Sequence, residues 1–241
     1  MKKYAFFDVD NTIYNGYLTS SFTNYMAENK LISRSHQKEN LKLQIDYEKG
    51  NISYNDSIIK IISLQAQSLK NKNVSEVKKV VKDFLSQNQK IFPYVKNLFS
   101  YLSKKGFVIY LISGATKPLI ESMGSFLKVY NIFASELEIK ETVYTGKVLN
   151  FQNAENKRKT ILNLIKEKST ADTILSFGDS VGDIEMLRLA DHAFVINPHQ
   201  KEMIDLAKKE NWFLVNEKNI FSEVIKALKP TINPYTTDFN P

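Results

Sequence analysis

The chain has 241 residues, 43% of them hydrophobic, which is enough for one large core and a small second domain, and it has no cysteine, which excludes disulfides, thiolate zinc sites and cysteine nucleophiles. No run of about 18 apolar residues is present, so we expect a cytoplasmic protein without a membrane partner. The net charge is +7, but the lysines are scattered beside acidic residues without a basic-aromatic patch, so we expect no nucleic-acid partner.

Two aspartates follow an apolar run at the start of the chain. Residues 4–7 have the composition of a short buried strand, and Asp8 and Asp10 come directly after it. Open α/β sheets place ligands at the carboxyl ends of their strands. A buried carboxylate is costly unless a cation or hydrogen-bond donors offset it, so the pair points to a site. Taken alone, a strand followed by an Asp/Asn turn explains it equally well.

The following segment is predicted to be helical. Residues 17–92 show few strand-like runs and several windows with helical spacing, with breaks at Gly50 and at residues 70–73. We therefore expect an all-helical cap domain over residues 16–92, inserted after the first strand. Residues 1–15 and 93–229 then form an α/β core domain, and 230–241 form a C-terminal tail.

Strands and helices alternate after residue 93. This alternation predicts a doubly wound parallel sheet with helices on both faces. Residues 142–148, with their Gly turn, are expected to form a small hairpin. The predicted strands cover residues 107–112, 173–177, 193–196 and 212–215.

Three of the predicted strands end in side chains that suit a phosphate and a divalent metal ion. The first strand leads into Asp8 and the second into Ser113. A later strand leads into Asp179 and Asp183, and Lys157 opens a helix between them. Carboxylates are the oxygen ligands that Mg²⁺ prefers. We therefore expect these side chains to meet at one edge of the sheet.

The remaining members fit the phosphate. Ser113 and the backbone N–H of Gly114, at a helix start, hydrogen-bond phosphoryl oxygens, while Lys157 supplies positive charge. Each also has a plainer explanation: a helix N-cap for Ser113, a first-turn acid for Asp183 and a surface lysine for Lys157. Their joint occurrence at strand ends favours the site.

At these residues the chain resembles the haloacid dehalogenase superfamily, and most closely its phosphoserine-phosphatase-like members with a helical cap. The four motifs match residues 8–12, Ser113, Lys157 and residues 178–183. Lys157 has apolar residues four and seven positions later, as the family helix does, whereas Lys159 does not. The resemblance implies a Rossmann-type core in which Ser113 and Lys157 assist catalysis.

What the resemblance implies is a two-step phosphoryl transfer. Asp8 would attack phosphorus to form an aspartyl-phosphate, and Asp10 would act as general acid and then base. Mg²⁺ would be held by Asp8, the main-chain carbonyl of Asp10 and Asp179, with Asp183 in support and Thr12 stabilising the loop. A dehalogenase needs no acid for its leaving halide, so Asp10 favours phosphate esters.

The cap departs from the pattern of phosphoserine phosphatases. Tyr17 stands where they carry a Glu for the substrate amine, and Ile61 where they carry an Arg for its carboxylate. We therefore expect another small phosphorylated metabolite as substrate, although Lys60 or Arg34 are alternative partners for a carboxylate. The aromatic side chains expected to contact it are Tyr14, Tyr17, Phe22 and Tyr47.

Two other functions remain open from the residues. A phosphotransferase or mutase would pass the phosphoryl group from Asp8 to a hydroxyl other than water. A non-catalytic interaction protein on the same fold is disfavoured, because all the catalytic positions are filled. The sequence leaves the oligomeric state undecided.

Overall fold

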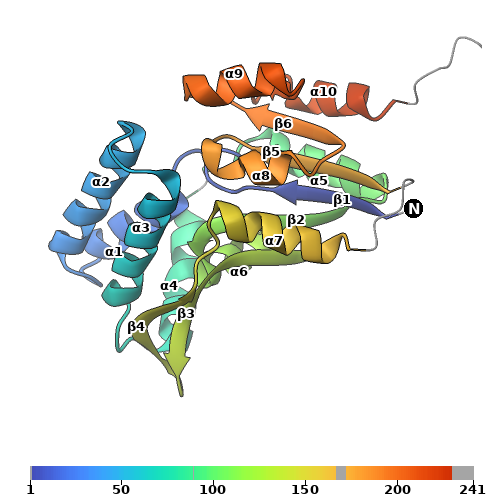
Figure 1. Cartoon of the computed structure of the whole chain (residues 1–241). Helices are drawn as coiled ribbons and strands as arrows, with labels where there is room; N and C mark the ends of the chain where they lie inside the picture. The colour runs from blue at the N-terminus through green and yellow to red at the C-terminus, as the bar shows by residue number, and fades with distance from the viewer. Residues whose placement is uncertain (1, 89, 167–171, 230–241) are drawn as a thin grey trace, which may run out of the picture.

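One seven-stranded sheet organises the molecule (Figure 1). The structure is a computed structural model and describes residues 2–88, 90–166 and 172–229. The strand order is β4-β3-β2-β1-β5-β6-β7, and the pairings are parallel except for β3 with β4. The strands are β1 (Lys3–Phe7), β2 (Val108–Thr116), β3 (Asn131–Lys140), β4 (Val143–Asn150), β5 (Thr173–Gly178), β6 (His192–Ile196) and β7 (Phe213–Val215).

The helices fall into two groups, one between β1 and β2 and one that follows β2 in the chain. The first group is α1 (Leu18–Glu28), α2 (Arg34–Glu48), α3 (Tyr54–Ser68), α4 (Val74–Gln87) and α5 (Tyr94–Lys104). The second is α6 (Lys117–Leu127), α7 (Ala154–Leu164), the short 3-10 turn η1 (Val181–Asp183), α8 (Ile184–Leu187), α9 (Lys201–Lys209) and α10 (Ile220–Ala227).

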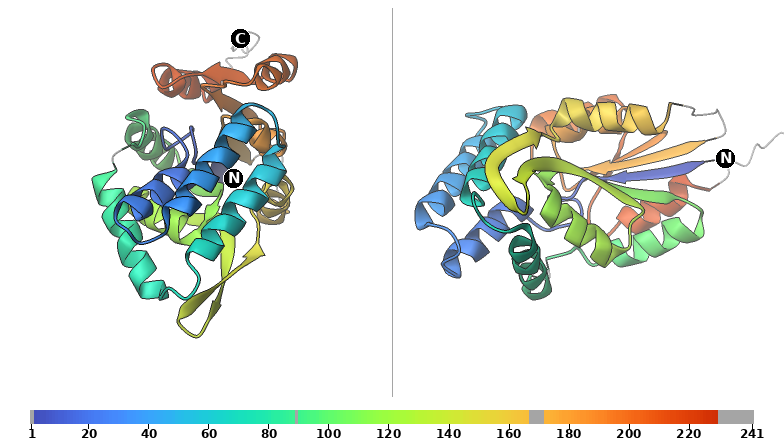
Figure 2. Two further views of the ribbon diagram at one scale, coloured as in Figure 1. Left: turned by 90° about the vertical axis from the view of Figure 1, so that its left-hand side faces the viewer. Right: turned by 90° about the horizontal axis from the view of Figure 1, so that it is seen from below.

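Helices cover both faces of the sheet, which confirms the doubly wound prediction (Figure 2). Tyr4 and Phe6 of β1 are buried with residues of α7 and α8, whereas Ala5 and Phe7 are buried with residues of α5 and α6. Both faces of β1 are therefore apolar, as expected for a central parallel strand. The ring of Phe7 stacks on that of Phe177 in β5, with 4.0 Å between the centroids.

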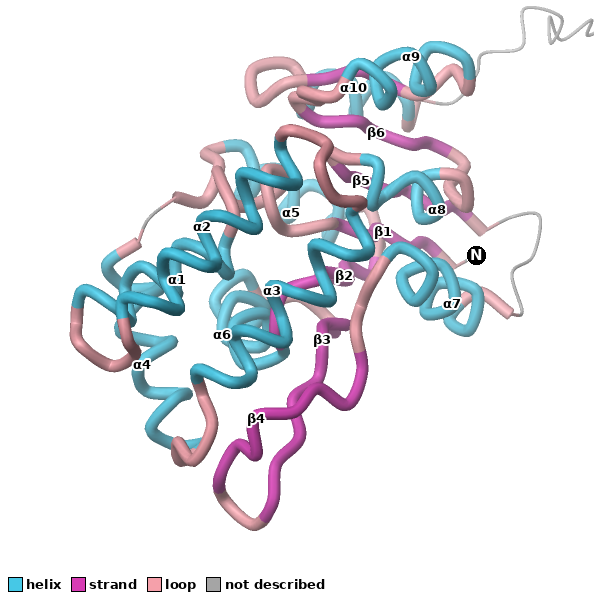
Figure 3. Tube along the Cα trace, turned by 60° about the vertical axis from the view of Figure 1, so that its left-hand side comes forward, coloured by secondary structure: helices cyan, strands magenta, loops and turns pink. Residues whose placement is uncertain are grey.

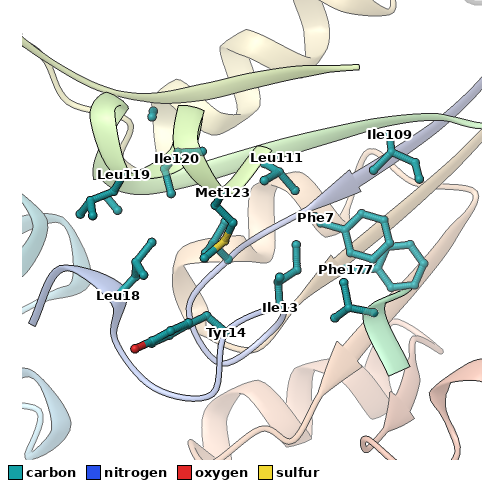
Figure 4. Close-up of a cluster of buried hydrophobic side chains, with 14 of the residues drawn as sticks. Phe7, Ile13, Tyr14, Leu18, Ile109, Leu111, Leu119, Ile120, Met123 and Phe177 are labelled. Atoms are coloured by element: carbon teal, nitrogen blue, oxygen red, sulfur yellow. The ribbon is translucent and has the colours of Figure 1, made fainter. Parts of the chain in front are cut away.

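Helices α1 to α4 stand beyond the carboxyl ends of β1 and β2, where the sequence predicts the cap (Figure 3). Gly50 separates α2 from α3, and residues 70–73 lie between α3 and α4, as predicted. Helices α1, α3 and α4 share one apolar cluster with the sheet, since α4 packs on α6 and Leu18 lies near Leu119 and Met123 (Figure 4). The domain boundaries at 15/16 and 92/93 thus stay a prediction. The described helices are all too short or too polar to cross a membrane.

The hairpin prediction for residues 142–148 is wrong. Residues 143–148 belong to the single strand β4, which pairs with β3, and the turn between the two strands lies at Glu141, with φ 55°. Gly146 lies inside β4 with φ +88°, where the pairing register shifts and a bulge forms. The sequence missed β3 because charged side chains such as Glu136 and Glu138 interrupt its apolar pattern. The predicted tail, residues 230–241, lies outside the described residues.

Candidate active site

Asp8 and Asp10 occupy the carboxyl end of β1. The Asp8 N–H donates to the carbonyl of Phe177 at 2.9 Å, so β1 and β5 stay paired up to this residue. The chain then turns sharply. The Val9 carbonyl accepts hydrogen bonds from several N–H groups that follow it in the chain, including that of Thr12 at 3.3 Å. Asp10 Oδ1 accepts from the Leu18 N–H at 2.8 Å, which fixes the second carboxylate against the start of α1.

Thr12 supports this turn through its main chain. Its carbonyl accepts from the hydroxyl of Tyr94 in α5. Its own hydroxyl is buried without a hydrogen-bond partner among the described residues. The Thr12 main chain therefore contributes to the turn, whereas a stabilising role of its side chain stays a prediction.

Lys157 is the cation at the centre of the cluster. Its side chain is 1% exposed, and Nζ lies 2.5 Å from Asp8 Oδ1 and 2.7 Å from Asp183 Oδ1. Burial alone would lower the pKa of Lys157, but Asp183 and Asp8 raise it well above its ordinary value. Lys157 lies in the first turn of α7, which begins at Ala154 rather than at Lys157 as predicted. It is a buried ion-pair partner and not a surface lysine.

Asp183 organises the loop that follows β5. Its Oδ2 accepts from the N–H groups of Asp179 at 3.2 Å and Ser180 at 3.3 Å, so η1 is closed by a capping box. A Cβ on Gly178 would lie 2.5 Å from Asp183 Cβ, which explains why glycine precedes Asp179. One carboxylate thereby holds both Lys157 and the backbone that presents Asp179.

Ser113 and Gly114 lie inside β2 and not at a helix start, so the prediction of a helix dipole at Gly114 is wrong. The strand continues to Thr116, and α6 begins at Lys117. Ser113 Oγ accepts from the Ala115 N–H at 3.2 Å, and both residues are buried. The local reason is a register shift between β2 and β3 after Ile112, which carries the strand past the expected turn.

A chain of hydrogen bonds joins Gly114 in β2 to α7, the helix of Lys157. Ser135 Oγ donates to the Gly114 carbonyl at 2.7 Å and accepts from the Gln152 N–H at 2.9 Å. The Gln152 side chain then donates to the Thr160 hydroxyl in α7 at 3.0 Å. Ser135 and Gln152 were not predicted, because both lie in the segment whose strand pairing the sequence did not indicate.

The carboxylates outnumber the cation in this cluster. Oxygen atoms of Asp8, Asp179 and Asp183 lie within 4.8 Å of one another. Burial, and then repulsion by Asp183, raise the pKa of both Asp8 and Asp179 well above the ordinary value. Burial also raises the pKa of Asp10, to about 6, against the lowering effect of the Leu18 N–H. An oxygen-rich site with excess negative charge fits a divalent cation.

A cavity of about 70 Å³ opens above Asp8 and Asp10, and we call it the inner cavity. Tyr17 and Tyr47 line it, and their contact with a substrate stays a prediction. Tyr14 and Phe22 do not line it: both are fully buried in the apolar core, Phe22 packing on Phe84 with 5.4 Å between ring centroids. The turn after Asp10 directs Tyr14 into the core, so these two predictions are corrected.

Tyr54, at the start of α3, was missed by the sequence reasoning. Its ring lies over the site, and the ring centroid is 5.8 Å from Lys157 Nζ. A Cβ on Gly182 would overlap this ring, and one on Gly114 would lie 3.5 Å from its hydroxyl. Burial raises the pKa of Tyr54 far above its ordinary value, so the hydroxyl stays protonated. Gly182, in η1, was the available sequence signal for this close approach.

Several known proteins are similar to this chain. A family model of haloacid dehalogenase-like hydrolases matches residues 5–188. A histidinol-phosphatase of Neisseria meningitidis serogroup C is 24% identical over 231 residues, covering 90% of this chain and all of that protein. A phosphoserine phosphatase of Methanocaldococcus jannaschii is 25% identical over 232 residues, covering 95% and 98%.

Solved structures share the fold. A protein of unknown function from Bordetella pertussis Tohama I superimposes with a TM-score of 0.76 at 15% identity, covering 90% of this chain and 99% of that one. A substrate-bound phosphoserine phosphatase gives a TM-score of 0.69 at 20% identity, covering 95% and 99%.

Proposed function

The chain belongs to the haloacid dehalogenase-like hydrolase family, and we propose that it is a phosphatase that hydrolyses a small phosphomonoester through an aspartyl-phosphate on Asp8. The observation that carries the proposal is the position of Lys157, buried between Asp8 and Asp183 where β1 and β5 end. The relatives are named for different phosphoesters, so they support the reaction class and not one substrate.

The chain's own residues divide the reaction between them. Asp8 is the nucleophile, and Lys157 holds its carboxylate in place and offsets charge on the phosphoryl oxygens. Ser113 and the Gly114 N–H would bind those oxygens from β2. Asp10, with a pKa near 6, holds a proton over much of the range below neutral pH, so it can protonate the leaving alkoxide and later accept a proton from water.

Mg²⁺ is the metal ion that this donor set fits. Asp8, Asp179 and the Asp10 carbonyl would hold it, with Asp183 orienting the loop. When bound, the ion offsets the carboxylate charge and polarises the phosphoryl group.

Metal removal tests this part of the proposal. EDTA is expected to abolish hydrolysis of 4-nitrophenyl phosphate, and excess Mg²⁺ to restore it, because the carboxylates are otherwise uncompensated. Inorganic phosphate release is measured alongside nitrophenol release. Stoichiometric release supports hydrolysis, whereas transfer of the phosphoryl group to an added alcohol without free phosphate would indicate a phosphotransferase. Full activity in EDTA would contradict the metal assignment.

The substrate is proposed to differ from L-phosphoserine. Tyr17 and Ile61, the two residues at the positions of the missing Glu and Arg, both line the inner cavity. Lys60 and Arg34 are exposed and do not line it. A substrate carboxylate would thus lack a partner there, which costs binding energy. Turnover of L-phosphoserine well above a panel of other phosphomonoesters would overturn this point.

Ser135→Ala is expected to lower kcat about tenfold with little change in KM, because the Gly114 carbonyl and the Gln152 N–H lose their shared partner. The same loss should reduce stability by about 1–3 kcal/mol. Steady-state kinetics with 4-nitrophenyl phosphate and urea unfolding measure both effects. Ser103→Ala, an exposed position in α5, is the matched control. A raised KM at constant kcat would contradict a positioning role for Ser135.

A further inference from the structure

The inner cavity continues into a wider hollow toward solvent, which we call the outer basin. Tyr17, Tyr47 and Asp179 line both spaces, and Glu48, at the end of α2, lines the outer basin. The inner cavity, at about 70 Å³, is much smaller than the outer basin, at about 450 Å³. A phosphoryl group at Asp8 therefore fills much of it, and the leaving group extends toward the outer basin.

The charges along this path are almost all negative. Asp8, Asp10 and Asp179 are the charged side chains that line the inner cavity, and Glu48 joins them outside. Among the described lining residues, His199 at the outer mouth is the one side chain able to carry positive charge. A divalent cation and a phosphate dianion cancel each other, and Lys157 offsets only one of the four carboxylates of Asp8, Asp10, Asp179 and Asp183. The loaded site therefore keeps excess negative charge.

Glu48 is held at the outer basin by a hydrogen bond. The Gln44 amide, which lines the inner cavity, donates to Glu48 Oε1 at 2.9 Å. Glu48 is the last residue of α2, so the negative end of the helix dipole adds to its charge. Tyr47 is fixed nearby by a hydrogen bond from Gln200 to its hydroxyl at 3.4 Å. Aromatic faces beside carboxylates attract ammonium groups.

We propose that the site selects phosphomonoesters of small amino alcohols, whose leaving group carries a positive charge and no carboxylate. The inference rests on the proposed function for the phosphoryl group. Glu48, Tyr17 and Tyr47 bind the ammonium group at the junction of the inner cavity and the outer basin, and Ile58 and Ile61 contact the alkyl part from α3. An anionic leaving group would be repelled by the carboxylates that line these two spaces, because among the described residues no lysine or arginine lines either space to offset its charge.

Three phosphomonoesters of matched size test the charge preference: 2-aminoethyl phosphate, 2-hydroxyethyl phosphate and phosphoglycolate. With Mg²⁺ present at pH 8, where most imidazoles are neutral, we expect kcat/KM to fall about tenfold from the amine to the neutral ester, and further to the carboxylate. Equal values for the amine and the neutral ester, or a preference for phosphoglycolate, would overturn the proposal.

Glu48→Gln tests the residue that carries the argument. We expect the ratio of kcat/KM for 2-aminoethyl phosphate to that for 2-hydroxyethyl phosphate to fall about threefold, as for a partly exposed ion pair. Glu28→Gln, an exposed position in α1 away from the site, should leave the ratio unchanged. An unchanged ratio in Glu48→Gln would remove this residue from the proposal.

Calorimetry separates the failure of this inference from that of the phosphatase proposal. Asp8→Asn is titrated with the same three esters in the presence of Mg²⁺, so binding is measured without turnover. Tighter binding of 2-aminoethyl phosphate by about tenfold supports the charge preference even if no ester is hydrolysed. Equal dissociation constants beside clear phosphatase activity of the wild-type chain would reject the charge preference alone.

Discussion

Asp8→Asn is expected to lose phosphomonoester hydrolysis by at least about a thousandfold while the fold is retained. The amide keeps the shape of the carboxyl group, and its oxygen can still accept from Lys157 Nζ, which lies 2.5 Å from the present carboxylate. An amide is a poor nucleophile, so the aspartyl-phosphate does not form. Phosphate release from 4-nitrophenyl phosphate measures the loss.

The stability of Asp8→Asn separates chemistry from folding. Repulsion from Asp183 and burial both raise the pKa of Asp8, so a neutral side chain at this position should not lower the thermal midpoint in EDTA. Asp205→Asn, an exposed residue of α9, serves as the matched control and should keep full activity. Retention of more than a few per cent of activity by Asp8→Asn would exclude the covalent mechanism.

The strand ends were predictable from the sequence because parallel strands have a fixed direction. Once residues 4–7 and 173–177 are assigned to neighbouring parallel strands, the residues after them must lie at the same edge of the sheet. The structure confirms this for the convergence of Asp8, Asp179 and Asp183. Their roles in the reaction stay a prediction, which the substitutions test.

The part of the site that α3 forms was less predictable, because its position depends on packing between segments that are distant in the sequence. Tyr54 meets Gly182 because α3 packs against β2 and η1, and in the sequence only the glycine at position 182 points to this contact. Tyr14 and Phe22 were predicted to contact the substrate because they are aromatic. In the structure both rings pack in the apolar cluster instead, where their burial is favourable.

Lys157 could be chosen over Lys159 from the sequence alone, and the reason is helical periodicity. Ile161, four residues later on the same face, is fully buried against β1 and β2, so the helix presents Lys157 to the sheet. Lys159 faces solvent, where it pairs with Glu155 at 2.7 Å. Substitution of Lys159 is therefore a matched control, on the same helix, for substitution of Lys157.

Lys157→Met is expected to lower activity by about a thousandfold or more, because Asp8 loses the donor that orients it and the phosphoryl oxygens lose a buried positive charge. Methionine fills the space of the lysine stem, so the effect comes from the ammonium group. Breaking a buried ion pair on one side leaves Asp8 and Asp183 unpaired, which should reduce the free energy of unfolding by about 3 kcal/mol or more in EDTA.

Mg²⁺ is expected to recover part of that stability but little of the activity, because the ion offsets the carboxylate charge without replacing the Lys157 hydrogen bond to Asp8. Urea unfolding with and without Mg²⁺ measures the recovery. Lys159→Met should match the wild-type chain in both assays, since its ion pair is exposed. If Lys159→Met lost activity and Lys157→Met kept it, the register of α7 in the site would be wrong, and so would the assignment of Lys157.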